Sequence, residues 1–167
     1  SKNYKGNPKP VIITEYAANG SLEDILEHDR NLPENSILTP TIKHIIIFGI
    51  ASAMSYLHSY NIIHRDLKPA NILFDENFYP KIADFGLSKF QINPLNSIDD
   101  STKGTPLYMA PEVWNNEGHS KASDVYSFAL IVYELVTNEK PFKSLNYFQI
   151  FTKFSKRKTS PNRFICS

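Results

Sequence analysis

The longest patterned segment, residues 41–60, predicts an amphipathic helix with one wide apolar face. Its apolar residues recur every three or four positions, which brings their side chains onto one side of a helix. Thr39 can cap the first turn, and Pro40 suits the first helical position. The predicted apolar face consists of Ile42, Ile45, Ile46, Gly49, Ile50, Ala53 and Leu57.

Three further segments also predict helices. Residues 124–136 are apolar on nearly every side, which is typical of a helix buried in a core. Residues 144–154 show a second amphipathic pattern near the end of the chain. A short helix is expected after the Asn19-Gly20 turn, because Ser21 and Asp24 have the spacing of a capping box.

Short apolar runs predict strands. Residues 9–16, KPVIITEY, are rich in β-branched side chains and predict a short buried strand. The runs NILF (71–74) and PKIAD (80–84) are separated by the polar DENFY, so a β-hairpin is expected there. The predicted fold class is therefore α+β, mostly helical, with one short hairpin.

Composition limits the class of protein. A chain of 167 residues with 41% hydrophobic residues can form one domain that buries about 70% of its unfolded surface. The formal net charge of +1 gives no reason to expect a nucleic-acid partner. No apolar run reaches about 18 residues, so no membrane segment is expected. Cys166 is the single cysteine, which suggests a reducing, cytoplasmic location.

The polar loop HRDLKPAN, residues 64–71, contains the strongest candidate chemistry. It places Asp66, Lys68 and Asn71 close together, and the predicted hairpin returns Asp84 to the same place. Two carboxylates and an amide oxygen are ligands suited to Mg²⁺ carrying a polyphosphate. Lys68 adds positive charge where a transferred phosphoryl group would concentrate negative charge.

This loop, the DFG at residues 84–86 and the APE at residues 110–112 occur in the order seen in protein kinases. The chain therefore resembles the protein kinase family from residue 11 to about residue 154. The resemblance implies a kinase-like fold made mainly of the helical C-terminal lobe, with the N-terminal lobe almost entirely missing. Its expected parts are the last N-lobe strand and hinge (1–17), the C-lobe (18–154) with its catalytic loop (64–71) and activation segment (84–112), and a divergent tail (155–167).

The resemblance also implies catalytic roles for the polar residues. Asp66 would orient the substrate hydroxyl and accept its proton, and Lys68 would stabilise the transferring phosphoryl group. Asn71 and Asp84 would hold two Mg²⁺ ions. Asp124, at the start of a predicted helix, would anchor the backbone of the catalytic loop.

The family pattern further implies an ATP site at the hinge. Thr14 aligns with the gatekeeper position, so the backbone of Glu15 and Ala17 would pair with the adenine edge. Asp24 falls where the family often contacts the ribose. Leu73 would form the apolar floor beneath adenine.

Substrate class and regulation are implied by single positions. Lys68 and Thr105 match members that phosphorylate serine or threonine in protein substrates, and the chain looks most like the tyrosine-kinase-like group. Arg65 suggests regulation by a phosphate on the activation segment, because a guanidinium can bind phosphate through two hydrogen bonds. The candidate acceptors are Ser97, Ser101 and Thr102.

Two expected family features are absent from the sequence. No two of the six glycines are close enough for a G-x-G loop, and nothing before Thr14 resembles the strand lysine motif VAIK. We therefore expect a truncated kinase with little activity on its own. A non-catalytic binding module and a non-functional gene fragment remain alternatives. The sequence has five histidines, and their spacing does not match that of metal ligands. They are His28, His44, His58, His64 and His119.

Overall fold

The computed structural model describes residues 11, 13–90 and 106–155. Its helices are α1 (Leu22–Asn31), α2 (Pro40–Ser59), α3 (Pro111–Trp114), α4 (Lys121–Thr137) and α5 (Tyr147–Ser155). Its strands are β1 (Ile62–Ile63), β2 (Ile72–Phe74), β3 (Pro80–Ile82) and β4 (Lys89–Phe90). The described part of the chain is thus mostly helical, as the sequence predicted.

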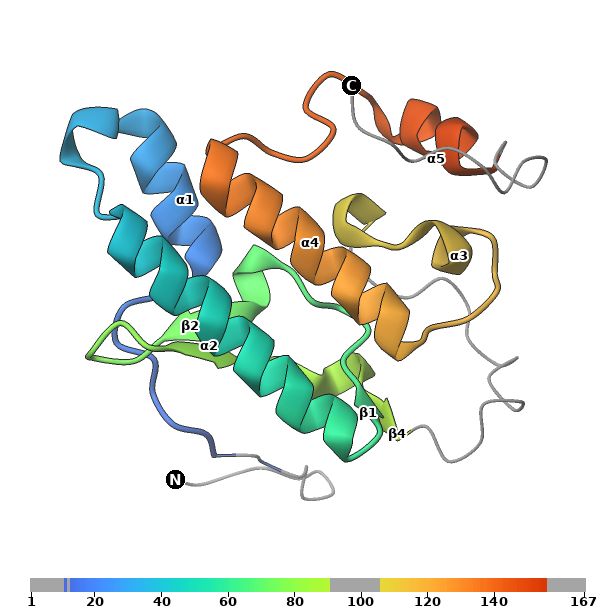
Figure 1. The fold of residues 1–167 in the computed structure, drawn as a ribbon, viewed down its shortest axis with the longest axis horizontal. Helices are drawn as coiled ribbons and strands as arrows, with labels where there is room; N and C mark the ends of the chain where they lie inside the picture. Colours follow the sequence, from blue (N-terminus) through green and yellow to red (C-terminus); the bar gives the residue numbers. More distant parts are fainter. Residues whose placement is uncertain (1–10, 12, 91–105, 156–167) are drawn as a thin grey trace, which may run out of the picture.

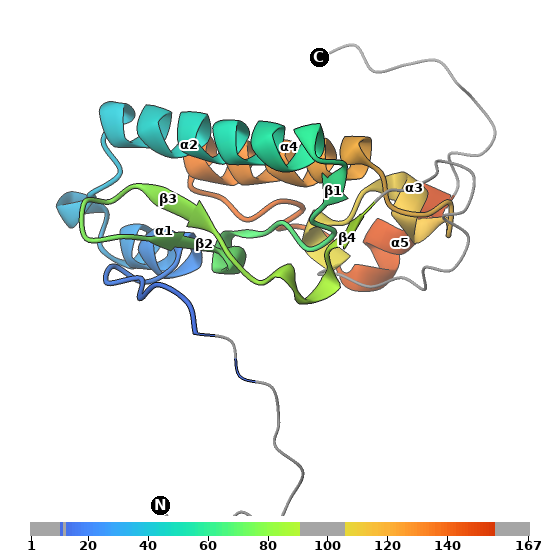
Figure 2. The ribbon, with the colours of Figure 1, turned by 90° about the horizontal axis from the view of Figure 1, so that it is seen from below.

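The two long helices organise the fold. Helices α2 and α4 lie side by side and run in opposite directions (Figures 1 and 2). Strand β3 packs against α2, and α1 packs against β2 on the other side of the hairpin. The loop between β1 and β2 lies beside the hairpin, on the same side of the helical pair (Figure 2).

The predicted hairpin is confirmed. Strands β2 and β3 are antiparallel, with Ile72 opposite Ile82 and Phe74 opposite Pro80. A second antiparallel pair, β1 with β4, was not predicted; it aligns Ile63 with Lys89. Two-residue strands carry too little pattern to be recognised from sequence.

The predicted starts of α1 and α2 are also confirmed, whereas α4 begins three residues before its predicted start and α5 three residues after. Ser21 and Asp24 form a reciprocal capping box at α1. At α2 the Thr39 hydroxyl accepts the Ile42 N–H at 3.3 Å, and Pro40 is the first helical residue. These caps satisfy backbone donors that have no partner within the helix.

Buried side chains form two clusters. The larger one lies between α1, α2, α4 and the hairpin, and includes Leu26, Ile46 and Leu135. The smaller one joins α3 to α5 through Trp114 and Phe154. Trp114 is 6% exposed, as expected for a core residue.

The strand predicted at residues 9–16 is wrong where it can be checked. Residues 11 and 13–16 have no regular secondary structure, and Val11 and Ile13 are 82% and 93% exposed. Residues 9, 10 and 12 lie outside the described part. β-Branched residues favour extended backbone, but a strand forms only where a neighbouring strand supplies hydrogen bonds. Within the described ranges, no strand pairs with this segment.

Two predicted burial patterns need correction. Ile45 is 41% exposed although it belongs to the predicted apolar face of α2. Helix α4 is not buried all round, because Ile131 is fully buried while Val125 and Val136 are 57% and 59% exposed. Hydrophobicity shows which side chains can be buried, but not which sides of a helix have a neighbour.

Helix α2 also differs from the expectation about membrane segments. The helix has 20 residues and contains an 18-residue stretch with a mean hydropathy of 1.2, so by length and composition alone it could cross a bilayer. The helix is not an uninterrupted apolar run, because polar residues such as Lys43, His44 and Ser52 lie between its apolar ones. In the structure it packs against β3 and α4.

Gly49 provides a direct test of the packing between α2 and the hairpin. A Cβ atom added there would lie 2.4 Å from Cγ of Pro80. We expect Gly49→Ala to destabilise the fold by about 1–2 kcal/mol, because overpacking outweighs the roughly 1 kcal/mol that alanine gains in a helix. Urea denaturation measures this, and Ser52→Ala on the exposed side of α2 is the control. If both substitutions raised the free energy of unfolding, the close contact between Gly49 and Pro80 would be contradicted.

Candidate active site

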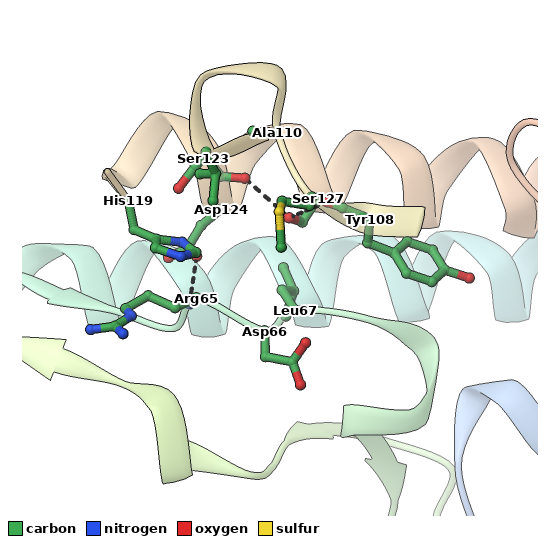
Figure 3. Close-up of a pocket in the computed structure, with 11 residues that line it drawn as sticks. Arg65, Asp66, Leu67, Tyr108, Ala110, His119, Ser123, Asp124 and Ser127 are labelled. Atoms are coloured by element: carbon green, nitrogen blue, oxygen red, sulfur yellow. Dashed lines mark hydrogen bonds between the residues drawn. The ribbon is translucent and has the colours of Figure 1, made fainter. Parts of the chain in front are cut away.

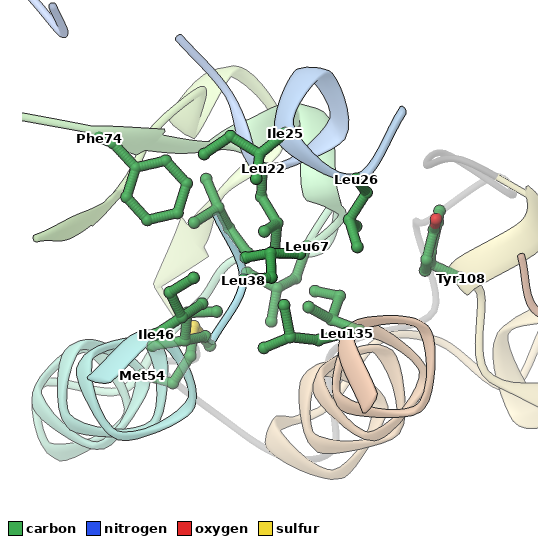
Figure 4. Packing of buried hydrophobic residues seen from close by; sticks show 13 residues of the cluster. Leu22, Ile25, Leu26, Leu38, Ile46, Met54, Leu67, Phe74, Tyr108 and Leu135 are labelled. Carbon is green, nitrogen blue, oxygen red and sulfur yellow. The ribbon is translucent and has the colours of Figure 1, made fainter. Parts of the chain in front are cut away.

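The loop of residues 64–71 is held in place by its apolar residue. Leu67 is 1% exposed and points into the main core, next to Leu22 and Leu38 (Figure 4). Its two sequence neighbours, Asp66 and Lys68, are polar. The burial of Leu67 therefore fixes the position of the loop backbone, which carries the Asp66 and Lys68 side chains on either side of Leu67 in the sequence.

Three of the predicted catalytic residues are in direct contact. Lys68 Nζ lies 2.9 Å from Asp66 Oδ2. The Asn71 side-chain amide donates to the Asp66 backbone oxygen at 2.8 Å and to Asp66 Oδ2 at 3.2 Å. Asp66 and Asn71 are 9% and 6% exposed, so these contacts orient groups that have little access to water.

Asp84 is brought to this loop by its neighbours. The Ala83 N–H donates to the Asn71 carbonyl at 2.8 Å, and the Ala83 carbonyl accepts from His64 Nε2 at 3.0 Å. The Phe85 ring stacks edge-on against His64, with ring centroids 5.3 Å apart. Asp84 itself is exposed, and its carboxylate accepts the Gly86 N–H at 3.3 Å.

The predicted anchoring of the loop by Asp124 is confirmed. Its carboxylate accepts the backbone N–H groups of His64 and Arg65, each at 2.9 Å. Arg65 has a φ of 75°, a left-handed conformation that costs a non-glycine residue about 1–3 kcal/mol. Asp124 is 1% exposed and supplies hydrogen bonds that hold this conformation.

Arg65 and Asp66 point to different sides of the loop (Figure 3). They line a space of about 10 Å³ together with His119, which is room for about one water molecule. Arg65 therefore lies close to the start of α4. Its proposed phosphate-bearing partners Ser97, Ser101 and Thr102, and also Thr105, lie outside the described residues.

The candidate nucleotide residues come from three segments of the chain: residues 15–17, α1 and β2. Leu73 is half-buried in β2 and forms a bridge with Ser21 at the start of α1. The exposed Glu15 carboxylate pairs with Lys81 Nζ at 2.6 Å, which ties its segment to β3. The half-buried Ala17 follows in this segment.

Asp24, predicted to contact the ribose, has a local role in the structure. Its carboxylate accepts the Ser21 hydroxyl at 2.6 Å and the Ser21 N–H at 2.9 Å. These hydrogen bonds hold the pKa of Asp24 below its ordinary value. A ribose contact would have to share this carboxylate with the helix cap.

Sequence reasoning missed three polar contacts between distant residues. His58 Nε2 lies 2.9 Å from Asp124 Oδ2, and Glu134 pairs with both Arg30 and the Tyr108 hydroxyl. His58 has no metal-ligand spacing to another histidine, and Glu134 lies in a nearly apolar segment, residues 124–136. No short-range pattern in the sequence marks any of these contacts.

Comparison with known proteins agrees with this geometry. Residues 2–163 match the family model described as protein kinase domain. The chain belongs to the protein kinase domain family.

The related proteins are described as serine/threonine kinases. A probable serine/threonine-protein kinase of Dictyostelium discoideum is 41% identical over 137 residues, or 81% of this chain. Serine/threonine-protein kinase RUNKEL of Arabidopsis thaliana is 38% identical over 95% of the chain, and probable serine/threonine-protein kinase drkC of Dictyostelium is 40% identical over 92%. The chain spans 13%, 11% and 20% of the lengths of these three relatives.

Proposed function

We propose that this chain supplies the catalytic loop and metal-binding end of a serine/threonine protein kinase of the tyrosine-kinase-like group. In the intact protein it would transfer the γ-phosphoryl group of ATP to a protein hydroxyl. The observation that supports this proposal most is the contact of Asp66 with both Lys68 and Asn71, beside the backbone position of Asp84. Identity to kinases over most of the chain adds to it.

The donor set fits Mg²⁺ bound together with nucleotide phosphates. The Asn71 Nδ2 group donates to Asp66, so the amide oxygen is the atom left to bind a cation. Asp84 adds an exposed carboxylate. Within the described ranges, no cluster of three or more His, Cys, Asp or Glu side chains could hold a metal alone. Bound Mg²⁺ would neutralise phosphate charge, and phosphate oxygens would complete its ligands.

The other residues would act directly on the reacting groups. Asp66 would accept a hydrogen bond from the substrate hydroxyl and then its proton. Lys68 contacts Asp66 now and would hold positive charge beside the transferred phosphoryl group. The backbone groups of Glu15 and Ala17 would pair with adenine, and the Leu73 side chain would form the apolar floor beneath it. The Asp24 carboxylate would contact the ribose.

Nucleotide affinity of the chain alone should be low. Without a glycine-rich loop over adenine, roughly 60–80 Å² of apolar area stays uncovered, worth about 1.5–2 kcal/mol. Each missing charge-assisted hydrogen bond to phosphate removes about 1.5–3 kcal/mol more. We expect millimolar binding of Mg-ATP and little phosphoryl transfer by the chain alone.

A thermal-shift measurement with Asp84→Ala tests this proposal. Ten millimolar Mg-ATP should raise the Tm of the unmodified chain by about 1–3 °C and leave that of Asp84→Ala unchanged. Glu76→Ala is the matched control, because it removes an exposed carboxylate from the far end of the same hairpin. Equal shifts in all three proteins, or no shift in any, would favour the alternative of a non-catalytic binding module.

A further inference from the structure

The end of α2 contains a partly buried partner of Asp124 to which the proposed function gives no role. His58 Nε2 lies 2.9 Å from Asp124 Oδ2, and the His58 side chain is 16% exposed. The Asp124 carboxylate accepts hydrogen bonds from two backbone N–H groups, and an ionised carboxylate has no proton to donate. It therefore accepts the hydrogen bond from His58 as well. The His58 ring must therefore be protonated at Nε2 and donate to Asp124.

The Asp124 carboxylate has three identified donors, and their arrangement fixes its orientation. Oδ2 is shared between His58 Nε2 and the His64 N–H, while Oδ1 accepts the Arg65 N–H. Rotating the carboxylate would disturb both bonds to the loop at once. His58 is the one donor of the three that is not part of the loop, so it holds the carboxylate from the side of α2.

We propose that His58 is a positioning residue for the catalytic loop. By orienting Asp124, it keeps Arg65 in its left-handed conformation, with φ of 75°. That conformation directs the Arg65 and Asp66 side chains to different sides of the loop (Figure 3). The relevance of His58 to phosphoryl transfer rests on the proposed function of Asp66. The effect of His58 on the conformation of the loop does not depend on that proposal.

His58 is also accessible to a small molecule. It lies in a groove of about 350 Å³ between α2 and α4, whose other lining residues are Ala51, Met54, Ser55, Asp124, Val125 and Phe128. An imidazole molecule is much smaller than this volume. If His58 were replaced by glycine, free imidazole could enter from the groove and donate its N–H to Asp124. Chemical rescue is therefore possible here.

Amide hydrogen exchange followed by NMR in the full 167-residue chain tests the proposal without any need for activity. In His58→Leu, the His64 and Arg65 amides should exchange at least ten times faster. The Phe74 and Ile25 amides, which donate to Gly20 and Ser21, should change less than twofold. His58→Gln, which keeps an N–H donor, should stay within threefold of the unmodified chain. Adding 50 mM imidazole to His58→Gly should restore most of the protection.

Two outcomes would overturn the proposal. One is unchanged exchange at His64 and Arg65 in His58→Leu. The other is equal loss of protection in His58→Gln and His58→Leu with no imidazole rescue, which would mean that His58 only fills space. If the exchange results hold but Asp84→Ala still binds Mg-ATP like the unmodified chain, the positioning role stands and the proposed function fails.

Discussion

Replacing Asp124 with alanine is expected to lower the free energy of unfolding by about 3–5 kcal/mol. The substitution removes the acceptor of the His64 and Arg65 N–H groups and of His58 Nε2. Each buried donor left without a partner costs about 1–3 kcal/mol. The left-handed backbone of Arg65 also loses the bond that holds it. Urea denaturation followed by the fluorescence of Trp114 would measure the change.

Two neighbouring substitutions separate this effect from general disruption of α4. Asp124→Asn should be nearly as destabilising, because its amide keeps one acceptor oxygen but directs a donor at another donor. Val125→Ala alters a side chain that is 57% exposed and should cost less than about 1 kcal/mol. An Asp124→Ala chain that unfolds at the same urea concentration as Val125→Ala would refute the anchoring role.

Replacing Glu134 with leucine is expected to cost about 2–4 kcal/mol. Glu134 is 2% exposed, and its carboxylate pairs with the Arg30 guanidinium and accepts the Tyr108 hydroxyl. Burial, together with the Glu134 carboxylate, raises the pKa of Tyr108. The Arg30 side chain is 22% exposed, so it can recover some hydration, which keeps the expected loss below that of a fully buried pair.

The double variant Arg30→Met with Glu134→Leu tests the origin of that loss. Removing both charges should destabilise less than Glu134→Leu alone, because no unpaired guanidinium remains. Glu139→Gln is the surface control, since Glu139 lies 4.0 Å from Lys143 in an exposed pair and should change stability by less than about 0.5 kcal/mol. Additive losses in the double variant would contradict a coupled buried pair.

Local chemistry explains the parts of the fold that could be predicted. The capping box of Ser21 with Asp24 and the hairpin between Asn71 and Asp84 depend on residues only a few positions apart. Helical periodicity likewise located α2 and α5. Motif order, from the catalytic loop to the APE, then identified the family.

Parts that depend on distant partners could not be predicted. Arg30 meets Glu134 across 104 positions, and His58 meets Asp124 across 66. The exposure of Val136 depends on which neighbours cover α4, and a strand around Ile13 would need a partner strand. A single sequence shows which secondary structure each segment favours, but it does not show which other segments will pack against it.

The proposed function requires Asn71 and Asp84 to bind one magnesium–nucleotide complex beside Asp66. Paramagnetic broadening by Mn²⁺–ATP, observed by NMR on the ¹⁵N-labelled chain, measures this binding at single residues. We expect broadening centred on the amides of Asn71, Asp84 and Gly86, stronger than with Mn²⁺ alone and lost in Asp84→Ala. Broadening centred elsewhere, or unchanged in Asp84→Ala, would refute the proposed site.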